Sequence, residues 1–171
     1  NWKGLKIDQL QDDVRWKYGI PPAGNANFAW IQHMVASMDP IHGKCVVIMP
    51  QGVLFHGGKE GDIRKKLIQN DKVEAIIILP RNLFYTTDIS VTLWIINKNK
   101  KARVVEQNGQ LKRYRNREKE ILFMDLRQMG SPYEKKYVEL TEEDLLIDVQ
   151  QKAGYFSMAE GTTTIALDTN L

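Results

Sequence analysis

Residues Gly43–Pro80, GKCVVIMPQGVLFHGGKEGDIRKKLIQNDKVEAIIILP, decide the fold. The apolar runs 43–49 and 73–79 each end at a proline, and neither shows the alternation of a half-exposed strand. Each run therefore predicts a strand buried on both faces, hence central and parallel. Asp62 is a candidate N-cap for a helix over 63–70 between them. Strand, helix and strand in this order predict a right-handed parallel unit.

The chain around this unit supplies further elements. The apolar spacing of 28–38 predicts a helix with one buried face, capped by Asn25 or Asn27. Residues 89–97 and 121–126 predict two more strands. We expect a three-layer α/β sheet in which 44–49 and 73–79 are parallel and 90–97 is antiparallel to its neighbour.

Local signals complete the outline toward the C-terminus. The Asn108-Gly109 step predicts a hairpin. Thr141, with Asp144 three residues on, predicts a capped short helix. The tail over 161–171 shows no periodicity, and we expect it to be loosely held.

Composition narrows the classes of protein. The 171 residues are 43% hydrophobic, which excludes a wholly disordered chain. The apolar runs are far too short to span a bilayer. The single cysteine, Cys45, fits a reducing compartment, and we expect a cytoplasmic location.

Charge is unevenly distributed along the chain. Residues 1–117 carry 19 Lys and Arg against 10 Asp and Glu, whereas 118–171 carry 5 against 11. The steepest stretch, 98–119, has nine basic residues. It is typical of a polyanion-contacting surface, or of a solvated hairpin whose lysines discourage edge pairing.

The segment 55–62, Phe-His-Gly-Gly-Lys-Glu-Gly-Asp, follows a predicted strand and precedes a predicted helix. Its spacing does not match a nucleotide-binding P-loop. We expect a flexible active-site or DNA-facing loop, because ligands of open parallel sheets bind at the carboxyl ends of strands. The three histidines, His33, His42 and His56, lack metal-ligand spacing, so no metal site is predicted.

Phe84 and Tyr85 form an aromatic pair in a polar loop between two predicted strands. Such a pair can stack on a nucleobase. Alternatively, both rings pad the edge of the sheet.

Several ordered blocks over about 10–150 resemble the modification subunit of type I restriction-modification systems. They are RWKYGIPP from Arg15, NANFAWIQHM from Asn25, Gly57-Gly58, DIRK from Asp62, Leu79-Pro80, LFY from Leu83, VTLW from Val91, Asn97-Lys98 and LFMDLR from Leu122.

The resemblance implies a DNA adenine-N6 methyltransferase that uses S-adenosylmethionine. It implies a Rossmann-like sheet of seven strands, one of them antiparallel, and specificity and restriction subunits as partners. The family's glycine-rich cofactor loop and Asn-Pro-Pro-Phe motif are absent from these 171 residues; Pro21-Pro22 follows Ile20 and is not that motif. We expect a partial catalytic domain over 1–130, the C-terminal half of the sheet, then a helix and tail over 131–171. This piece alone should be inactive, with self-association through uncovered apolar surface.

The resemblance also suggests site residues. Phe28 would touch the adenine ring of the cofactor, or belong to the core. Phe84, with Tyr85 second, would stack on the target base. Phosphate contacts would come from Lys59, Arg64 and Arg81. No catalytic residue is expected here. The alternatives are a non-enzymatic module that binds nucleic acid or protein, and a weaker one, a nucleotide-binding domain that uses the loop 57–61.

Overall fold

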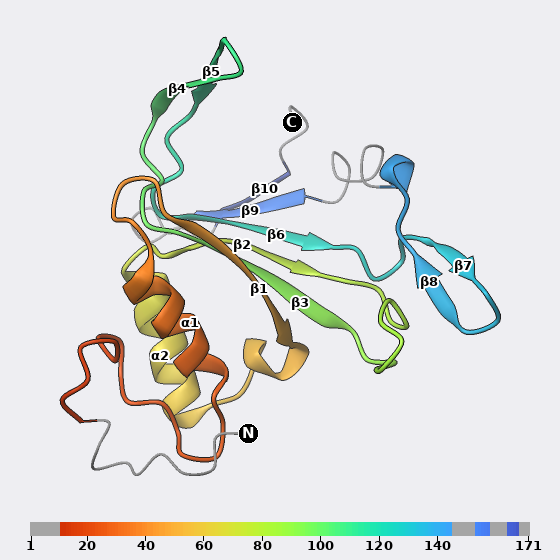
Figure 1. Ribbon diagram of the computed structural model, residues 1–171, viewed down its shortest axis with the longest axis horizontal. Helices are drawn as coiled ribbons and strands as arrows, with labels where there is room; N and C mark the ends of the chain where they lie inside the picture. The colour runs from red at the N-terminus through yellow and green to blue at the C-terminus, as the bar shows by residue number, and fades with distance from the viewer. Residues whose placement is uncertain (1–10, 145–152, 158–163, 168–171) are drawn as a thin grey trace.

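A computed structural model describes residues 11–144, 153–157 and 164–167 of the chain (Figure 1). The elements that lie whole within these ranges are two α-helices, one 3₁₀ turn and ten strands. They are α1 (Asn27–Ser37), β1 (Lys44–Pro50), η2 (Gln51–Leu54), α2 (Gly58–Gln69), β2 (Val73–Ile78), β3 (Val91–Asn97), β4 (Arg103–Gln107), β5 (Gln110–Tyr114), β6 (Glu120–Asp125), β7 (Ser131–Tyr133), β8 (Tyr137–Glu139), β9 (Ala153–Ser157) and β10 (Thr164–Leu167).

The main sheet has the strand order β1-β3-β2-β6-β9-β10. β3 is antiparallel to both of its neighbours, β1 and β2, and β2 is parallel to β6. β1 and β2 therefore run in the same direction, as predicted, with β3 inserted between them. The antiparallel direction predicted for 90–97 is confirmed, and the sheet is mixed, as expected. The expectation of one antiparallel strand is wrong, because β9 is also antiparallel to its neighbour β6.

The prediction that 43–49 is buried on both faces is wrong. β1 pairs only with β3 in the described residues, and its side chains alternate between the two faces. Val46 and Ile48 are 60% and 52% exposed, whereas Met49 is buried. An apolar run identifies a strand but not its neighbours, so burial on the second face does not follow from it. β2, between β3 and β6, is the strand that is buried on both faces.

Both described helices lie on one face of the sheet (Figure 1). α1 and α2 pack there against β1, β2 and β3, around the fully buried ring of Trp94. The described residues therefore form two layers, not the three that were predicted. A second, smaller cluster around Leu79, Met124 and Met129 lies where β2 and β6 end.

The helix predicted from Ile63 begins five residues earlier, at Gly58, and Asp62 is not its N-cap. Gly57 occupies the cap position in extended conformation and makes no side-chain cap hydrogen bond. The Arg64 guanidinium donates to the carbonyl of Val53 at 3.0 Å and to that of His56 at 2.9 Å. These contacts tie the preceding segment to the helix, so 58–61 are a helical turn rather than the flexible loop that was predicted.

α1 also differs at its first turn. It begins at Asn27, after Ala26 at the cap position, with no side-chain cap hydrogen bond. Asn25 Oδ1 instead accepts a hydrogen bond from the Asn27 backbone N–H at 2.9 Å. Neither asparagine therefore caps this helix as predicted.

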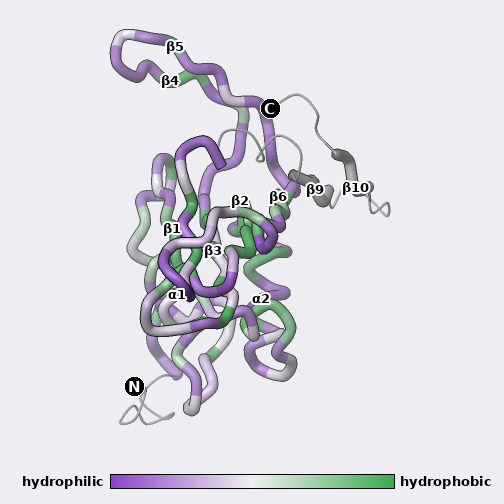
Figure 2. The backbone as a smooth tube through the Cα atoms, turned by 90° about the vertical axis from the view of Figure 1, so that its right-hand side faces the viewer, coloured by the Kyte–Doolittle hydropathy of each residue, from purple (hydrophilic) through white to green (hydrophobic). Residues whose placement is uncertain are grey.

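The hairpin predicted at Asn108-Gly109 is confirmed as β4–β5. Both turn residues have positive φ, 54° and 74°, as a type I′ turn requires. The hairpin projects from the end of the sheet where β3 finishes and is largely hydrophilic (Figures 1 and 2).

The Thr141 cap is confirmed as well. Its hydroxyl accepts from the Asp144 backbone N–H, and the Asp144 carboxylate accepts from the Thr141 backbone N–H. In the predicted tail, 164–167 form β10, whereas 161–163 and 168–171 lie outside the described residues. β9 pairs with β6, so the sheet continues past the boundary predicted at residue 130. No helix in the described part is long and apolar enough to cross a membrane.

Candidate nucleic-acid interface

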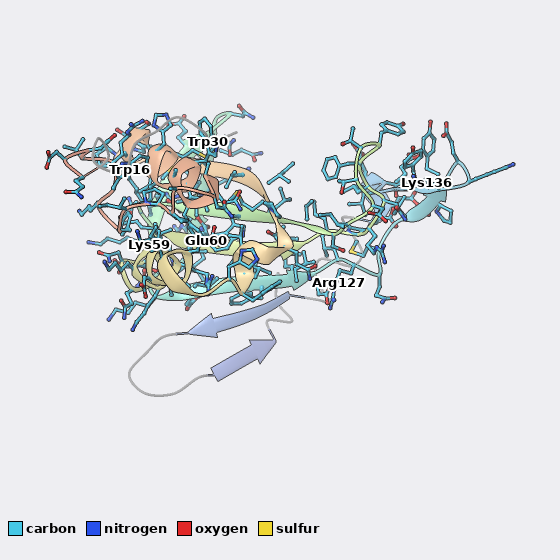
Figure 3. The ribbon with its side chains drawn as sticks, turned by 90° about the horizontal axis from the view of Figure 1, so that it is seen from below. Trp16, Trp30, Lys59, Glu60, Arg127 and Lys136 are labelled. Carbon is cyan, nitrogen blue, oxygen red and sulfur yellow. The ribbon has the colours of Figure 1, made fainter. Side chains whose placement is uncertain are left out.

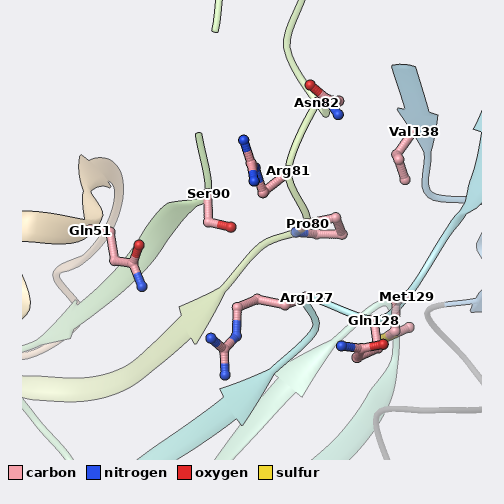
Figure 4. A pocket seen from close by; sticks show the side chains of 9 residues that line it. All are labelled: Gln51, Pro80, Arg81, Asn82, Ser90, Arg127, Gln128, Met129 and Val138. Atoms are coloured by element: carbon pink, nitrogen blue, oxygen red, sulfur yellow. The ribbon is translucent and has the colours of Figure 1, made fainter. Parts of the chain in front are cut away.

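An open pocket of about 640 Å³ lies at the edge of the sheet where β1, β2 and β6 end. Figure 4 shows its lining side chains on the segments that follow these strands, with the Arg81 and Arg127 guanidinium groups among them. Because parallel strands end at the same edge, residues far apart in sequence meet there. The lining residues are Gln51, Pro80, Arg81, Asn82, Ser90, Arg127, Gln128, Met129 and Val138.

Both arginines are held by carboxylates of neighbouring segments. Arg127 donates from Nε to Asp125 Oδ1 at 2.9 Å and from Nη2 to Oδ2 at 2.6 Å. Asp125 also raises the pKa of Arg127, so the guanidinium keeps its charge. Arg81 reaches the backbone carbonyl of Asp88 at 3.0 Å and its carboxylate at 3.4 Å. The pocket therefore presents oriented, charged donors with an acid beside each.

The aromatic pair lies next to this pocket, in the loop between β2 and β3. Phe84 is half-buried and packs on the smaller cluster, whereas Tyr85 is 70% exposed. Of the two predicted roles, packing against the edge of the sheet therefore fits Phe84 better than Tyr85. Both rings line a second open pocket, of about 270 Å³, together with Lys136 and Tyr137.

The β7–β8 hairpin supports Tyr85 from the other side. The Tyr137 ring meets the Tyr85 ring edge-on, with centroids 4.7 Å apart. The Tyr133 phenol contributes most to raising the pKa of Tyr85, followed by burial. The hairpin is joined to the loop through the Val138 N–H, which donates to the Asn82 carbonyl at 3.1 Å. Tyr85 is thus held at the second pocket, while most of its ring stays exposed.

The other residues predicted for the site lie elsewhere. Phe28 is fully buried and meets Trp94 edge-on, with ring centroids 6.1 Å apart, so its surroundings are those of a core residue. Lys59 lies on the first turn of α2, away from Arg127 and Lys136 (Figure 3). One guanidinium nitrogen of Arg64 donates hydrogen bonds to two backbone carbonyls. Of the cations predicted to meet phosphate, only Arg81 lies at the pocket.

Sequence analysis missed Arg127, Tyr133 and Tyr137. Arg127 belongs to the block LFMDLR and follows a strand that ends at the same edge as β2, which was the available signal. Nothing in the sequence shows that the 131–139 hairpin reaches Tyr85, because that contact spans more than 45 residues. No group of three or more potential metal ligands occurs in the described ranges.

Comparison with known proteins identifies a family and several relatives of the chain. The family model described as N-6 DNA Methylase matches residues 1–166. The HindI methylase subunit of Haemophilus influenzae is 38% identical over 139 residues, 81% of this chain and 28% of that protein. The MjaIX methylase subunit of Methanocaldococcus jannaschii is 43% identical over 94 residues, 52% of this chain and 17% of that protein.

A solved structure shows the same fold. The type I restriction-modification methyltransferase subunit of Streptococcus thermophilus superposes with a TM-score of 0.70 at 25% identity. The match covers 88% of this chain and 30% of that one, so the chain spans less than a third of the relatives it matches. The chain therefore belongs to the N-6 DNA methylase family and resembles, within it, the methylase subunits of type I restriction enzymes.

Proposed function

We propose that the chain forms the C-terminal half of the methyl-transfer domain of a DNA adenine-N6 methyltransferase. The observation that carries the proposal is the antiparallel β3 between parallel β1 and β2, with an aromatic pair at the edge where β2 ends. An antiparallel strand within the sheet is a feature that the family resemblance implies, and it supports the proposal. S-adenosylmethionine is the proposed donor, and DNA with the specificity and restriction subunits are the proposed partners, in the cytoplasm.

The pocket supports base access rather than methyl transfer itself. An adenine inside a duplex must leave the stack before its amino group can react, and a flipped base is held between aromatic or apolar groups. Tyr85 presents an exposed ring for that contact. Phe84 instead packs on the smaller apolar cluster and supports the loop. Arg81 and Arg127 supply charge for the adjacent phosphates.

The remaining requirements lie outside these residues. Transfer needs the donor methyl and the target nitrogen at reacting distance. The glycine-rich cofactor loop and the Asn-Pro-Pro-Phe motif that the resemblance implies are not among these 171 residues. We therefore propose that this segment alone is inactive, and that the exposed Val46 and Ile48 of β1 promote its self-association.

In the full-length protein, Tyr85→Ala should lower kcat/KM for DNA methylation by about five- to 150-fold, the loss of one base–aromatic stack. Tyr85→Phe keeps the ring and should retain most activity. Donor binding, measured by calorimetry, should not change. Trp30→Ala, which removes a half-exposed ring from α1, serves as the distant control.

The Phe84→Ala variant tests whether Phe84 stacks on the target base or only packs against the sheet. If Phe84 only supports the loop, its removal should destabilise the protein more than Tyr85→Ala does. A larger methylation loss for Phe84→Ala, with stability unchanged, would assign the stacking role to Phe84. Unchanged methylation in both variants would contradict the proposed interface.

A further inference from the structure

A separate pocket of about 190 Å³ lies at the opposite end of the sheet, next to the start of β2 and the end of β3. The segment before α1, one side of α1 and the residues Lys72 and Lys98 enclose it. The residues that line the pocket at Arg81 and Arg127 contribute nothing to it. Its lining residues are Val14, Arg15, Lys17, Tyr18, Gln32, Val35, Ala36, Lys72 and Lys98.

The wall of this pocket is strongly cationic. Arg15 is neutralised by Asp13, whose carboxylate it contacts at 2.5 Å. The three lysines, in contrast, form no ion pair with any described residue. The Lys98 ammonium donates to the carbonyl of Met38 at 2.6 Å, which satisfies a hydrogen bond without cancelling the charge.

Two carboxylates act on these lysines, Asp39 on Lys98 and Asp71 on Lys72, but they do not cancel the positive charge. Asp71 stands beside Lys72 in the chain, but its carboxylate contacts the buried ammonium of Lys100 and accepts from the Lys119 backbone N–H at 2.9 Å. Asp71 is therefore shared with a charge that lies deeper in the protein. An excess of positive charge remains at the pocket.

The pKa of Lys72 reflects this excess of positive charge. Burial lowers its pKa most, and the charges of Lys17, Lys98 and Lys100 lower it further, against the opposing effect of Asp71. Because the pKa is below its unfolded value, the unoccupied protein should gain stability as pH rises from that lowered pKa toward 10.5. The fold thus holds like charges together, and an anion in the pocket would relieve their repulsion.

We propose that this pocket binds a phosphate group. Three ammonium groups match the divalent charge of phosphate better than the single charge of a carboxylate, and lysines serve as point-charge donors for phosphate. At ~30 Å³ per water, the volume holds about six waters, enough for one phosphate with part of its hydration. The buried amide of Gln32 shapes the floor: it accepts from the Tyr18 N–H at 3.0 Å and donates to the Gly19 carbonyl at 2.8 Å.

The test compares Lys72→Gln with Lys65→Gln in the full-length protein. Lys65 is an exposed lysine of α2 that does not line the pocket. Thermal unfolding is followed in chloride, acetate and inorganic phosphate at equal ionic strength. Phosphate should raise the Tm of the unsubstituted protein and of Lys65→Gln more than acetate does. In Lys72→Gln, phosphate affinity should fall about tenfold or more, the loss of one charge-assisted hydrogen bond.

A second signature comes without any ligand. In chloride, Lys72→Gln should have a higher Tm than the unsubstituted protein, because one of the repelling charges is gone. Lys65→Gln should not show this gain. Equal stabilisation by phosphate in both variants would mean that phosphate acts elsewhere and would overturn the proposal. Equal stabilisation by phosphate and acetate would also overturn it.

The phosphate could belong to a nucleic-acid backbone or to a small molecule, and a binding assay distinguishes them. The salt dependence of affinity is measured for a duplex that lacks the target adenine. If the pocket takes a backbone phosphate, the slope of log affinity against log salt should fall by about one in Lys72→Gln but not in Lys65→Gln. Unchanged slopes together with a lost phosphate effect on Tm would assign the pocket to a small phosphorylated ligand.

Discussion

Trp94→Ala should lower the free energy of unfolding by about 3–5 kcal/mol, the range for truncating a large buried aromatic. The ring is fully buried in the middle of the sheet, where Trp94 pairs with Val47 on one side and Ile76 on the other. It also meets the Phe28 ring edge-on, with 88° between the planes. Urea unfolding followed by far-UV circular dichroism measures the effect without relying on tryptophan fluorescence.

The polar end of Trp94 contributes to the same loss. Its Nε1–H donates to Thr92 Oγ1 at 3.2 Å, and that hydroxyl donates to the Met49 carbonyl at 3.1 Å. Trp94→Phe removes this bond but keeps most of the apolar contact, so it should cost less than Trp94→Ala. Leu111→Ala, at a 72% exposed position, should stay within about 0.5 kcal/mol of the unsubstituted protein. A loss below 1 kcal/mol for Trp94→Ala would contradict the core described above.

Lys100→Met should lower the free energy of unfolding by about 3 kcal/mol, because it removes one partner of a buried ion pair. The Lys100 side chain is fully buried. Its ammonium contacts the Asp71 carboxylate and donates to the carbonyls of Val73 at 3.1 Å and Glu120 at 2.6 Å. Methionine fills a similar volume but leaves these three acceptors without their donor. Equilibrium urea unfolding gives the change.

Lys101→Met is the matched control, since this neighbouring lysine is exposed and should change stability by no more than about 0.5 kcal/mol. Asp71→Asn combined with Lys100→Met completes a double-mutant cycle. The double variant should lose less than the sum of the two single losses, because the carboxylate no longer lacks its partner. Additive losses would show that the pair is not coupled.

Lys100 also ties together the segments at the end of the sheet where β2 begins. Its bonds to the segment before β2 and to the start of β6 fix the root of the β4–β5 hairpin. Glu74 strengthens the same region through Arg117 and through Asn97 Nδ2, which donates to it at 2.5 Å. The opposite end of the sheet, where β2 and β6 finish, holds the pocket lined by Arg81 and Arg127.

Some sequence predictions needed only local physics. The Asn108-Gly109 turn follows from two adjacent residues that tolerate positive φ, and the Thr141 cap follows from a hydroxyl three residues before its backbone partner. The failure at Gly58 has an equally specific cause. Glycine is a poor helix former, but Arg64, which donates to the carbonyls of Val53 and His56, and Glu60, which pairs with His56, tie this turn to the preceding segment. The helix propensities of single residues do not include such contacts between distant residues.

The sequence by itself determined that β1, β2 and β3 are strands and that β1 and β2 share a direction. It also determined that the ordered motifs resemble those of a methylase family. Those properties follow from apolar runs, prolines and ordered motifs within short stretches. Only the tertiary structure decided that β1 has an exposed face, that Tyr85 rather than Phe84 presents its ring, and that Lys17, Lys72 and Lys98 surround one pocket. The reason is that exposure and charge clustering depend on which distant segments the folded sheet brings together, and local pattern carries no such information.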